Sequence, residues 1–283
     1  MNGLKRKSLD EPAKQKKKKK ELSLLDQYEL ETSKANKLRD ELNLIKNAYK
    51  IVTCTNDAID YMRSLFKEET FNNLPPIIYL NQVYSLFKNR TEVDRDIESM
   101  RLKNEIRLFK ADSKEFLSED LFICYTRDLK SYVQNLADPT GSNRAENEQR
   151  FQHLKDKFVN RILNETFEIT ISREKLMKTF GIFESDLTSL VQMGLFAIKD
   201  SNDLWFSVPN IGKFRRSSVE ARRKIVNLIR NKRYKEISVE ELIKRNHKDL
   251  NDIGLPYLYF DLVGSDIVKK VDSPLDAVII QLI

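Results

Sequence analysis

The chain has 283 residues, of which 40% are apolar and 33% are charged, and this length is enough for two or three small domains. It contains no run of about 18 apolar residues, which argues against a transmembrane helix, and its first 20 residues lack the apolar segment of a secretory signal. Two cysteines exclude a disulfide framework and a four-cysteine zinc site, and seven glycines argue against a phosphate-cradling loop. We therefore expect an intracellular, multidomain protein without metal.

Positive charge is concentrated in two segments. The net charge is +7, and residues 1–20 carry nine bases and two acids. Residues 213–235 carry ten bases and one acid, so the rest of the chain is acidic. Two basic segments in an otherwise acidic chain indicate two separate uses of positive charge.

The first basic segment is too poor in apolar residues to fold alone. Its two clusters are typical of a nuclear import signal and consist of Lys5, Arg6 and Lys7, followed by Lys16, Lys17, Lys18, Lys19 and Lys20. The alternative is a solvated tail that contacts nucleic acid without specificity. Residues 21–50 have a weak helical pattern, so we expect 1–50 to be a disordered basic tail followed by a linker or a loosely attached helix.

From about residue 55 onward, one pattern occurs three times. Two helical segments are followed by a third helix that ends at a residue suited to a left-handed backbone, and then by two apolar strands joined by a polar tip. The first copy has expected helices at about 56–69, 78–86 and 97–103, the left-handed residue Asn104, strands at 106–109 and 121–124, and a tip at 111–119.

The second and third copies repeat this order. The second has expected helices at about 146–163, 172–180 and 187–193, the left-handed residue Gly194, and strands at 195–198 and 204–208. The third has expected helices at about 218–232, 239–246 and 257–263, the left-handed residue Gly264, strands at 267–271 and 275–282, and a tip at 272–274.

Three helices followed by a two-stranded hairpin are typical of the winged-helix form of helix-turn-helix domains. We therefore predict an α+β fold that is mainly α with small β-hairpins. The predicted organisation is three tandem winged-helix domains at 51–138, 145–212 and 213–283, after the basic tail and linker at 1–50.

Several short motifs occur in an order typical of one family. They include Leu74-Pro75-Pro76-Ile77, Gln82-Val83-Tyr84-Ser85-Leu86, Thr179-Phe180-Gly181, Val208-Pro209 and Asp261-Leu262-Val263-Gly264. Over about 70–283, the chain resembles the serine/threonine-protein kinase 19 family, whose members are also called winged-helix repair factors. The resemblance implies a nuclear protein that binds double-stranded DNA. It also implies a role in transcription-coupled nucleotide excision repair, with RNA polymerase II and repair factors as partners.

The residues do not support the kinase chemistry that the family's name suggests. Ala197-Ile198-Lys199 mimics the strand-lysine motif of protein kinases, but no G-x-G-x-x-G loop precedes it and no metal-binding Asp-Phe-Gly follows. His153 and His247 have no Ser or Cys partner at a recognisable spacing. We therefore predict a non-catalytic protein with no cofactor, no small-molecule substrate and no membrane contact.

The third helices of the copies are poor candidates for reading DNA. The third helix of the second copy carries Glu184 and Asp186 but no base, and residues 255–262 of the third copy also contain no base. A helix as apolar as the latter is expected to be buried or docked on a protein. The adaptor alternative, a winged-helix array that binds only other proteins, therefore stays open.

The second basic segment is the better candidate for DNA contact. Its helical spacing turns Ala221, Ile225, Leu228 and Ile229 toward the core and places Arg216, Arg223 and Arg230, seven residues apart, on the opposite face. Such a row can follow phosphates without reading bases. The alternative is a solvated helix face, but such faces ordinarily mix both signs of charge, and this segment has a single acid, Glu220. The candidate DNA-binding residues are Lys213, Arg215, Arg216, Arg223, Arg230, Lys232, Arg233, Lys235 and Arg245, the last of which rests on the family resemblance.

Overall fold

The computed structural model describes residues 24–110, 121–137, 145–245, 248–271 and 277–283. The chain divides into two units, Met1–Lys37 and Leu38–Ile283, and the first helix, α1 (Leu24–Ile51), contains the boundary between them. The expected import signal in residues 1–20 and the expected hairpin tips at 111–119 and 272–274 lie outside the described residues. Among the described helices, none is both long and apolar enough to cross a membrane.

The segment expected to be a linker or a loosely attached helix forms α1. In the second unit, Ile45 and Ala48 of this helix are buried, and Leu42 packs against the same core. Their spacing of three residues places them on one face of the helix. The packed part of the chain therefore begins before the expected domain boundary at residue 51.

The first copy of the pattern contains three helices, a short 3-10 turn and three strands, and a further helix follows it. Its elements are α2 (Thr55–Leu65), η1 (Glu68–Phe71), β1 (Ile78–Tyr79), α3 (Leu80–Tyr84), α4 (Arg90–Leu102), β2 (Ile106–Lys110), β3 (Leu121–Tyr125) and α5 (Thr126–Gln134). The expected helix at 78–86 is shorter than predicted, because its first two residues pair with β3 as a strand.

The second copy has the same order of elements. They are α6 (Ala145–Lys157), the π-helical turn η2 (Phe158–Ile162), α7 (Leu163–Glu165), β4 (Thr170–Ser172), α8 (Arg173–Lys178), α9 (Glu184–Gln192), β5 (Phe196–Ile198) and β6 (Asp203–Phe206). The Ser172 hydroxyl accepts a hydrogen bond from the Lys175 backbone N–H and so caps α8.

The third copy begins with the longest helix of the pattern. Its elements are α10 (Gly212–Arg230), β7 (Glu236–Ser238), α11 (Val239–Lys244), α12 (Lys248–Ile253), α13 (Leu255–Gly264), β8 (Val268–Val271) and β9 (Ile279–Leu282). The Ser238 hydroxyl accepts from the Glu241 backbone N–H and caps α11, as Ser172 caps α8.

The described residues form three antiparallel sheets with one topology. The strand orders are β1-β3-β2, β4-β6-β5 and β7-β9-β8. In each sheet the last strand lies in the centre, between its hairpin partner and a short strand that precedes the second helix of the copy. The mainly helical fold with small antiparallel sheets agrees with the predicted α+β class.

In the first and second copies, the third helix is followed by the expected residue with a left-handed backbone. Asn104 has a φ of 59° and Gly194 a φ of 78°. The expectation for Gly264 is wrong, because α13 includes this glycine and the left-handed residue is Asp266, with a φ of 57°. Gly264 is instead a packing residue, since a Cβ on it would lie 1.6 Å from the carbonyl oxygen of Asn81 in α3.

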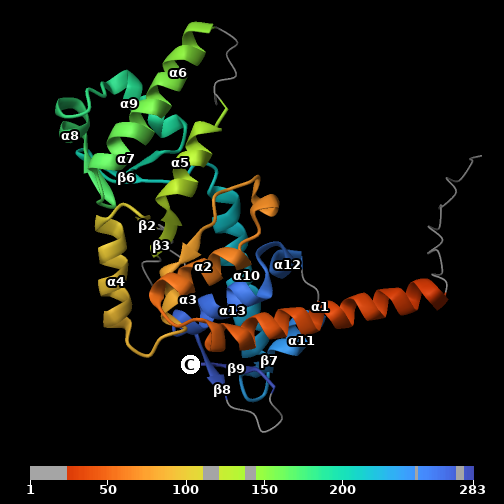
Figure 1. The fold of residues 1–283 in the computed structure, drawn as a ribbon. Helices are drawn as coiled ribbons and strands as arrows, with labels where there is room; N and C mark the ends of the chain where they lie inside the picture. The colour runs from red at the N-terminus through yellow and green to blue at the C-terminus, as the bar shows by residue number, and fades with distance from the viewer. Residues whose placement is uncertain (1–23, 111–120, 138–144, 246–247, 272–276) are drawn as a thin grey trace, which may run out of the picture. The chain divides into compact units, whose positions relative to one another are not determined.

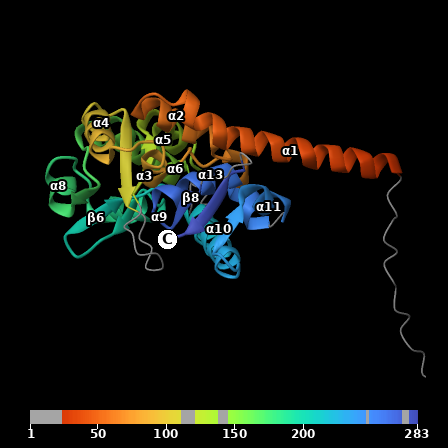
Figure 2. The same ribbon diagram turned by 90° about the horizontal axis from the view of Figure 1, so that it is seen from below.

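The third copy docks on the first through α13. The Tyr257 hydroxyl of α13 donates to the carbonyl of Ile77 at 2.7 Å, and the Gln82 amide of α3 donates to the carbonyl of Tyr257 at 2.9 Å. Figures 1 and 2 show α3 and α13 together within the second unit, and Figure 2 shows α10 below α13 and β8. The apolar third helix is therefore buried within the chain itself.

Candidate nucleic-acid interface

Helix α10 has a buried side and a basic exposed side. Phe214, Ala221, Ile225 and Ile229 are fully buried, and Leu228 is half-buried against the same core. The exposed side carries Arg216, Arg223 and Arg230, all of which are solvent-exposed as predicted. The helix begins at Gly212, early enough for all three arginines to project from regular helix.

The spacing of these arginines suits a row of phosphates. Successive members are seven residues apart, which corresponds to about 10 Å along the axis and about 21 Å for the whole row. Their direction rotates by only about 20° for each seven residues, so the three guanidinium groups stay on one face. Guanidinium groups form charge-assisted, bidentate hydrogen bonds to phosphate oxygens. We call this set, Arg216, Arg223 and Arg230, the arginine row.

Arg222 contributes to the basic composition of the segment but not to its surface. It is 1% exposed, and its guanidinium pairs with the buried carboxylate of Asp261 in α13 through two contacts of 2.5 Å. The same guanidinium lies over the ring of Tyr79, 4.7 Å from the centroid. It thus fixes α10 to α13 and to the first copy, and the sequence count of ten bases overstates the exposed charge.

The residues before the arginine row lie against the first copy. Lys213 is exposed, but its ammonium donates to the Thr70 carbonyl at 2.6 Å and lies 5.7 Å from the centroid of the Phe71 ring. Arg215 is half-buried. Both predicted site residues are therefore at the edge of the candidate surface rather than at its centre.

Two predicted site residues share one acidic partner. The Lys232 ammonium lies 2.7 Å from a carboxylate oxygen of Glu241, and the Arg245 guanidinium lies 2.6 Å from the same oxygen. The hydrogen bond from Lys232, followed by that from Arg245, holds the pKa of Glu241 below its ordinary value. Lys232 and Arg245 are therefore partly neutralised. The spacing of four residues between Glu241 and Arg245 was the signal in the sequence for the second of these pairs.

The turn after α10 brings the remaining candidates to the end of the helix. Arg233, Tyr234 and Lys235 are all exposed, and Lys235 adopts a left-handed φ of 52°. The Arg233 guanidinium lies over the Tyr234 ring, 5.3 Å from its centroid. Tyr234 was not among the predicted site residues. Its position between Arg233 and Lys235 was the signal in the sequence that could have identified it.

The third helices do not compete with α10 for DNA. Helix α13 is buried, as the sequence led us to expect. Helix α9 carries acids and no base, and its exposed Glu184 and half-buried Asp186 pair with Arg173 and Arg150 at 3.1 and 2.6 Å. Helix α4 is exposed but mixes both signs of charge.

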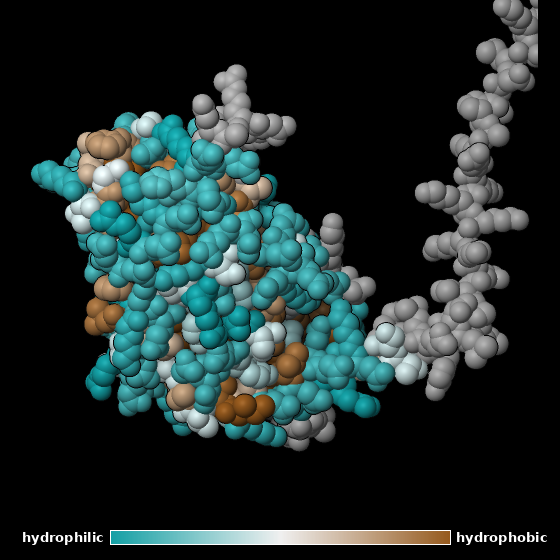
Figure 3. Space-filling model, turned by 45° about the horizontal axis from the view of Figure 1, so that its top comes forward, coloured by the Kyte–Doolittle hydropathy of each residue, from teal (hydrophilic) through white to brown (hydrophobic). Residues whose placement is uncertain are grey.

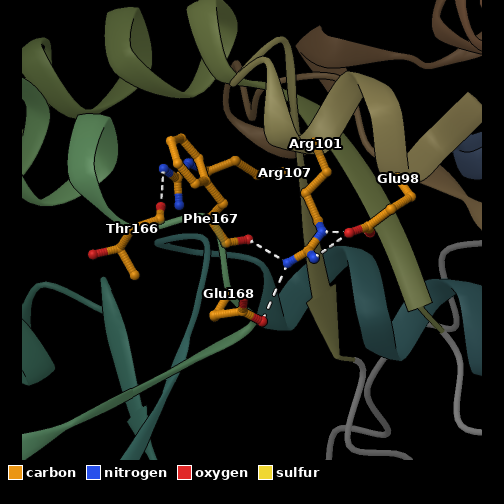
Figure 4. Close-up of polar contacts among 6 residues, drawn as sticks. All are labelled: Glu98, Arg101, Arg107, Thr166, Phe167 and Glu168. Carbon is orange, nitrogen blue, oxygen red and sulfur yellow. Dashed lines mark hydrogen bonds and ion pairs between the residues drawn. The ribbon is translucent and has the colours of Figure 1, made fainter.

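Arg101 of α4 joins the first copy to the second (Figure 4). Its guanidinium lies 2.7 Å from the carboxylate of Glu98, one turn away, and 3.2 Å from that of Glu168. It also donates to the Phe167 carbonyl at 3.0 Å. The side chain is thereby fixed at the contact between the copies and is not available to a duplex.

Arg107 of β2 reinforces the same contact from a buried position (Figure 4). It is 4% exposed, donates to the Thr166 carbonyl at 2.5 Å and to the Leu163 carbonyl, and lies over the Phe206 ring. Burial without a carboxylate partner lowers its pKa to about 10. Both arginines hold the two copies together, so neither side chain is available to a duplex.

The described residues contain no group of three His, Cys, Asp or Glu side chains placed to hold a metal ion. Cys54 is exposed and Cys124 is buried, and burial raises the pKa of the Cys124 thiol well above its ordinary value. The expected import residues Lys5, Arg6, Lys7 and Lys16 to Lys20 lie outside the described residues.

The chain is similar to known proteins over most of its length. A family model described as inactive serine-threonine protein kinase 19 matches residues 47–253. Winged helix repair factor 1 of Homo sapiens is 27% identical over 217 residues, which cover 76% of this chain and 81% of the relative. The protein of that name from Xenopus laevis is 27% identical over 254 residues and covers 88% and 93%, and that from Mus musculus is 28% identical over 218 residues and covers 77% and 81%.

Proposed function

Because the chain belongs to the family described as inactive serine-threonine protein kinase 19, we propose that it is a DNA-binding scaffold that holds duplex phosphates on α10. The family description and the repair-factor names of its relatives make the chain a non-catalytic protein. They also relate it to DNA repair and to the winged-helix fold. The finer statements below are our proposals.

One observation carries the proposal of DNA binding. The arginine row is exposed along about 21 Å of a helix whose other side is buried, so it is presented on a rigid support. Arg230 is followed within the next turn by the exposed Arg233 and Lys235, which extend the positive surface. An ordinary solvated helix face mixes both signs of charge, whereas α10 contains a single acid, Glu220.

The proposed contact is independent of base sequence. Phosphate contacts fix the position of a duplex but carry no sequence information, which comes from side chains in the grooves. The helices that could enter a groove are buried in the case of α13 and acidic in the case of α9. Similar affinity for unrelated duplexes follows from this arrangement.

We assign the three copies to winged-helix domains at 51–138, 145–212 and 213–283. The common strand order of the three sheets supports the assignment, as does the start of α10 one residue before the third boundary. The use of a first helix for DNA, instead of the third, distinguishes this proposal from the usual winged-helix mode.

We place the function in the nucleus, where the two basic clusters of residues 1–20 would direct import. The family resemblance supports transcription-coupled nucleotide excision repair, beside RNA polymerase II and its repair factors, as the setting. Replacing Lys16 to Lys20 by alanine, with Lys5, Arg6 and Lys7 also neutralised, should move a fluorescent fusion out of the nucleus. Unchanged nuclear retention would contradict the import assignment.

The second candidate function is a protein adaptor without DNA binding. It is favoured by the absence of basic residues from α9, whose acids Glu184 and Asp186 pair with arginines of this chain. On the face shown in Figure 3, however, hydrophobic side chains form small, separate patches among hydrophilic ones. A large apolar surface of the kind that marks stable protein interfaces is not seen on that face.

Charge reversal at α10 separates these two functions. Replacing Arg216, Arg230 and Arg233 together by glutamate should abolish duplex binding measured by fluorescence anisotropy, with no change in unfolding temperature, because all three side chains are exposed. The matched control reverses Lys88, Lys103 and Lys175, which are also exposed and change the net charge equally. Normal binding by the α10 variant, or equal loss in both variants, would favour the adaptor.

A further inference from the structure

Tyr234 is an exposed aromatic residue that the phosphate contacts do not explain. It is 63% exposed and lies in the turn between α10 and β7. A tyrosine usually buries its apolar ring and keeps only its hydroxyl in water. Most of this ring is instead in solvent, where a binding partner can contact it.

The position of Tyr234 is fixed by the backbone on both sides. The Lys235 N–H donates to the Lys232 carbonyl at 3.1 Å, and the Leu282 N–H of β9 donates to the Lys235 carbonyl at 3.0 Å. The Gln281 amide donates to the Tyr234 carbonyl itself at 3.3 Å. The ring is thus presented to solvent by an ordered turn, which lowers the entropic cost of binding.

The surroundings of the ring are cationic. Exposed Arg233 and Lys235 flank it in sequence, and the Arg233 guanidinium lies 5.3 Å from the ring centroid. Tyr234 is four residues from Arg230, so it lies at most about 14 Å from the end of the arginine row. An aromatic face beside positive charge is the combination that binds unpaired nucleotides. The nucleobases stack on the aromatic ring, and the phosphates pair with the lysine and arginine side chains.

We propose that Tyr234 stacks on an unpaired base at the end of the duplex held by α10, so that the surface prefers a junction between double-stranded and single-stranded DNA. This inference rests on the proposed function. Within a continuous duplex, each base is already stacked on both faces, and opening a step costs energy. At a junction, the first unpaired base offers a free face without that cost.

The alternative occupant of Tyr234 is a protein surface. Aromatic anchors of protein interfaces are typically surrounded by other groups that exclude water, and charged residues are depleted at the interface core. Tyr234 instead has a cation on each side in sequence. The charge of its neighbours therefore favours the nucleotide.

The test compares a blunt duplex with a forked duplex of the same paired sequence, using the full chain. Loss of a base–aromatic stack weakens binding by about fivefold to about 140-fold. The wild-type protein should therefore bind the fork at least about fivefold more tightly than the blunt duplex, and Tyr234→Ala should remove this preference. Tyr234→Phe should keep it, because stacking needs the ring and not the hydroxyl.

With 2-aminopurine as the first unpaired base of the fork, fluorescence should be quenched by the wild type and Tyr234→Phe but not by Tyr234→Ala.

Phe183→Ala is the matched control, because Phe183 is 62% exposed but precedes the acidic helix α9. It should leave the preference for the fork unchanged. Equal affinity of Tyr234→Ala and wild type for the fork, or equal loss on fork and blunt duplex, would overturn the inference while leaving the phosphate surface intact. Absence of any duplex binding by the wild type would instead contradict the proposed function itself.

Discussion

Replacing Asp261 by alanine should destabilise the protein strongly, although the residue lies outside the DNA surface. The carboxylate is fully buried and receives two contacts of 2.5 Å from Arg222, which is 1% exposed. Removing it leaves a buried guanidinium without its counter-charge, which costs about 3–5 kcal/mol. For a protein of this size each kcal/mol lowers the unfolding temperature by about 2–4 °C, so the expected loss is about 6–20 °C.

Differential scanning calorimetry and urea unfolding would measure this effect. The double variant Arg222→Met, Asp261→Leu should be much closer to wild type than Asp261→Ala, because it removes both charges and retains apolar volume. It should also keep the wild-type affinity for DNA, since neither residue faces solvent. A loss below about 1 kcal/mol for Asp261→Ala, or a double variant that is equally unstable, would refute the assignment of Arg222 to the core.

Three further variants test other contacts. Gly264→Ala should lower the unfolding temperature because its Cβ would lie 1.6 Å from a backbone oxygen of α3, whereas Gly212→Ala, with open space around its Cβ, should not. Glu241→Gln should tighten duplex binding in anisotropy titrations, because it releases the two basic side chains that the carboxylate pairs with; weaker binding would contradict this. Arg107→Met should reduce the free energy of unfolding by about 1–3 kcal/mol, since buried carbonyls lose their donor, and an unchanged urea midpoint would argue against that role.

The sequence predicted secondary structure correctly in segments long enough to show a regular spacing of apolar residues. The hairpin strands, the left-handed Asn104 and Gly194, and the two sides of α10 all follow from local spacing, and the structure confirms them. The strands β1, β4 and β7 were missed because two or three residues are too few to show an alternation. They form because each pairs with the free edge of the last strand of its hairpin. The two paired strands are far apart in the sequence.

Contacts that the predictions from helical and strand spacing did not consider account for the other differences. Composition counts Arg222 as surface charge, but the fold brings it to Asp261, 39 positions away. Gly264 looks like a helix cap in the sequence, yet it is required by the close approach of α3. Glu241 and Tyr234 change the candidate site in opposite senses, one by neutralising two bases and the other by adding an aromatic face. Each of these effects depends on which residues meet in the folded chain.

The most direct test of the central claim is the salt dependence of duplex binding by the wild type and by the variant Arg216→Gln, Arg230→Gln, Arg233→Gln. Each phosphate contact contributes about 0.9 to the slope of log affinity against log salt concentration. Three lost contacts should therefore reduce the magnitude of the slope by about 2.7, and by the same amount for two duplexes of unrelated sequence. An unchanged slope, or a reduction confined to one of the two sequences, would contradict the claim that α10 holds the duplex through its phosphates.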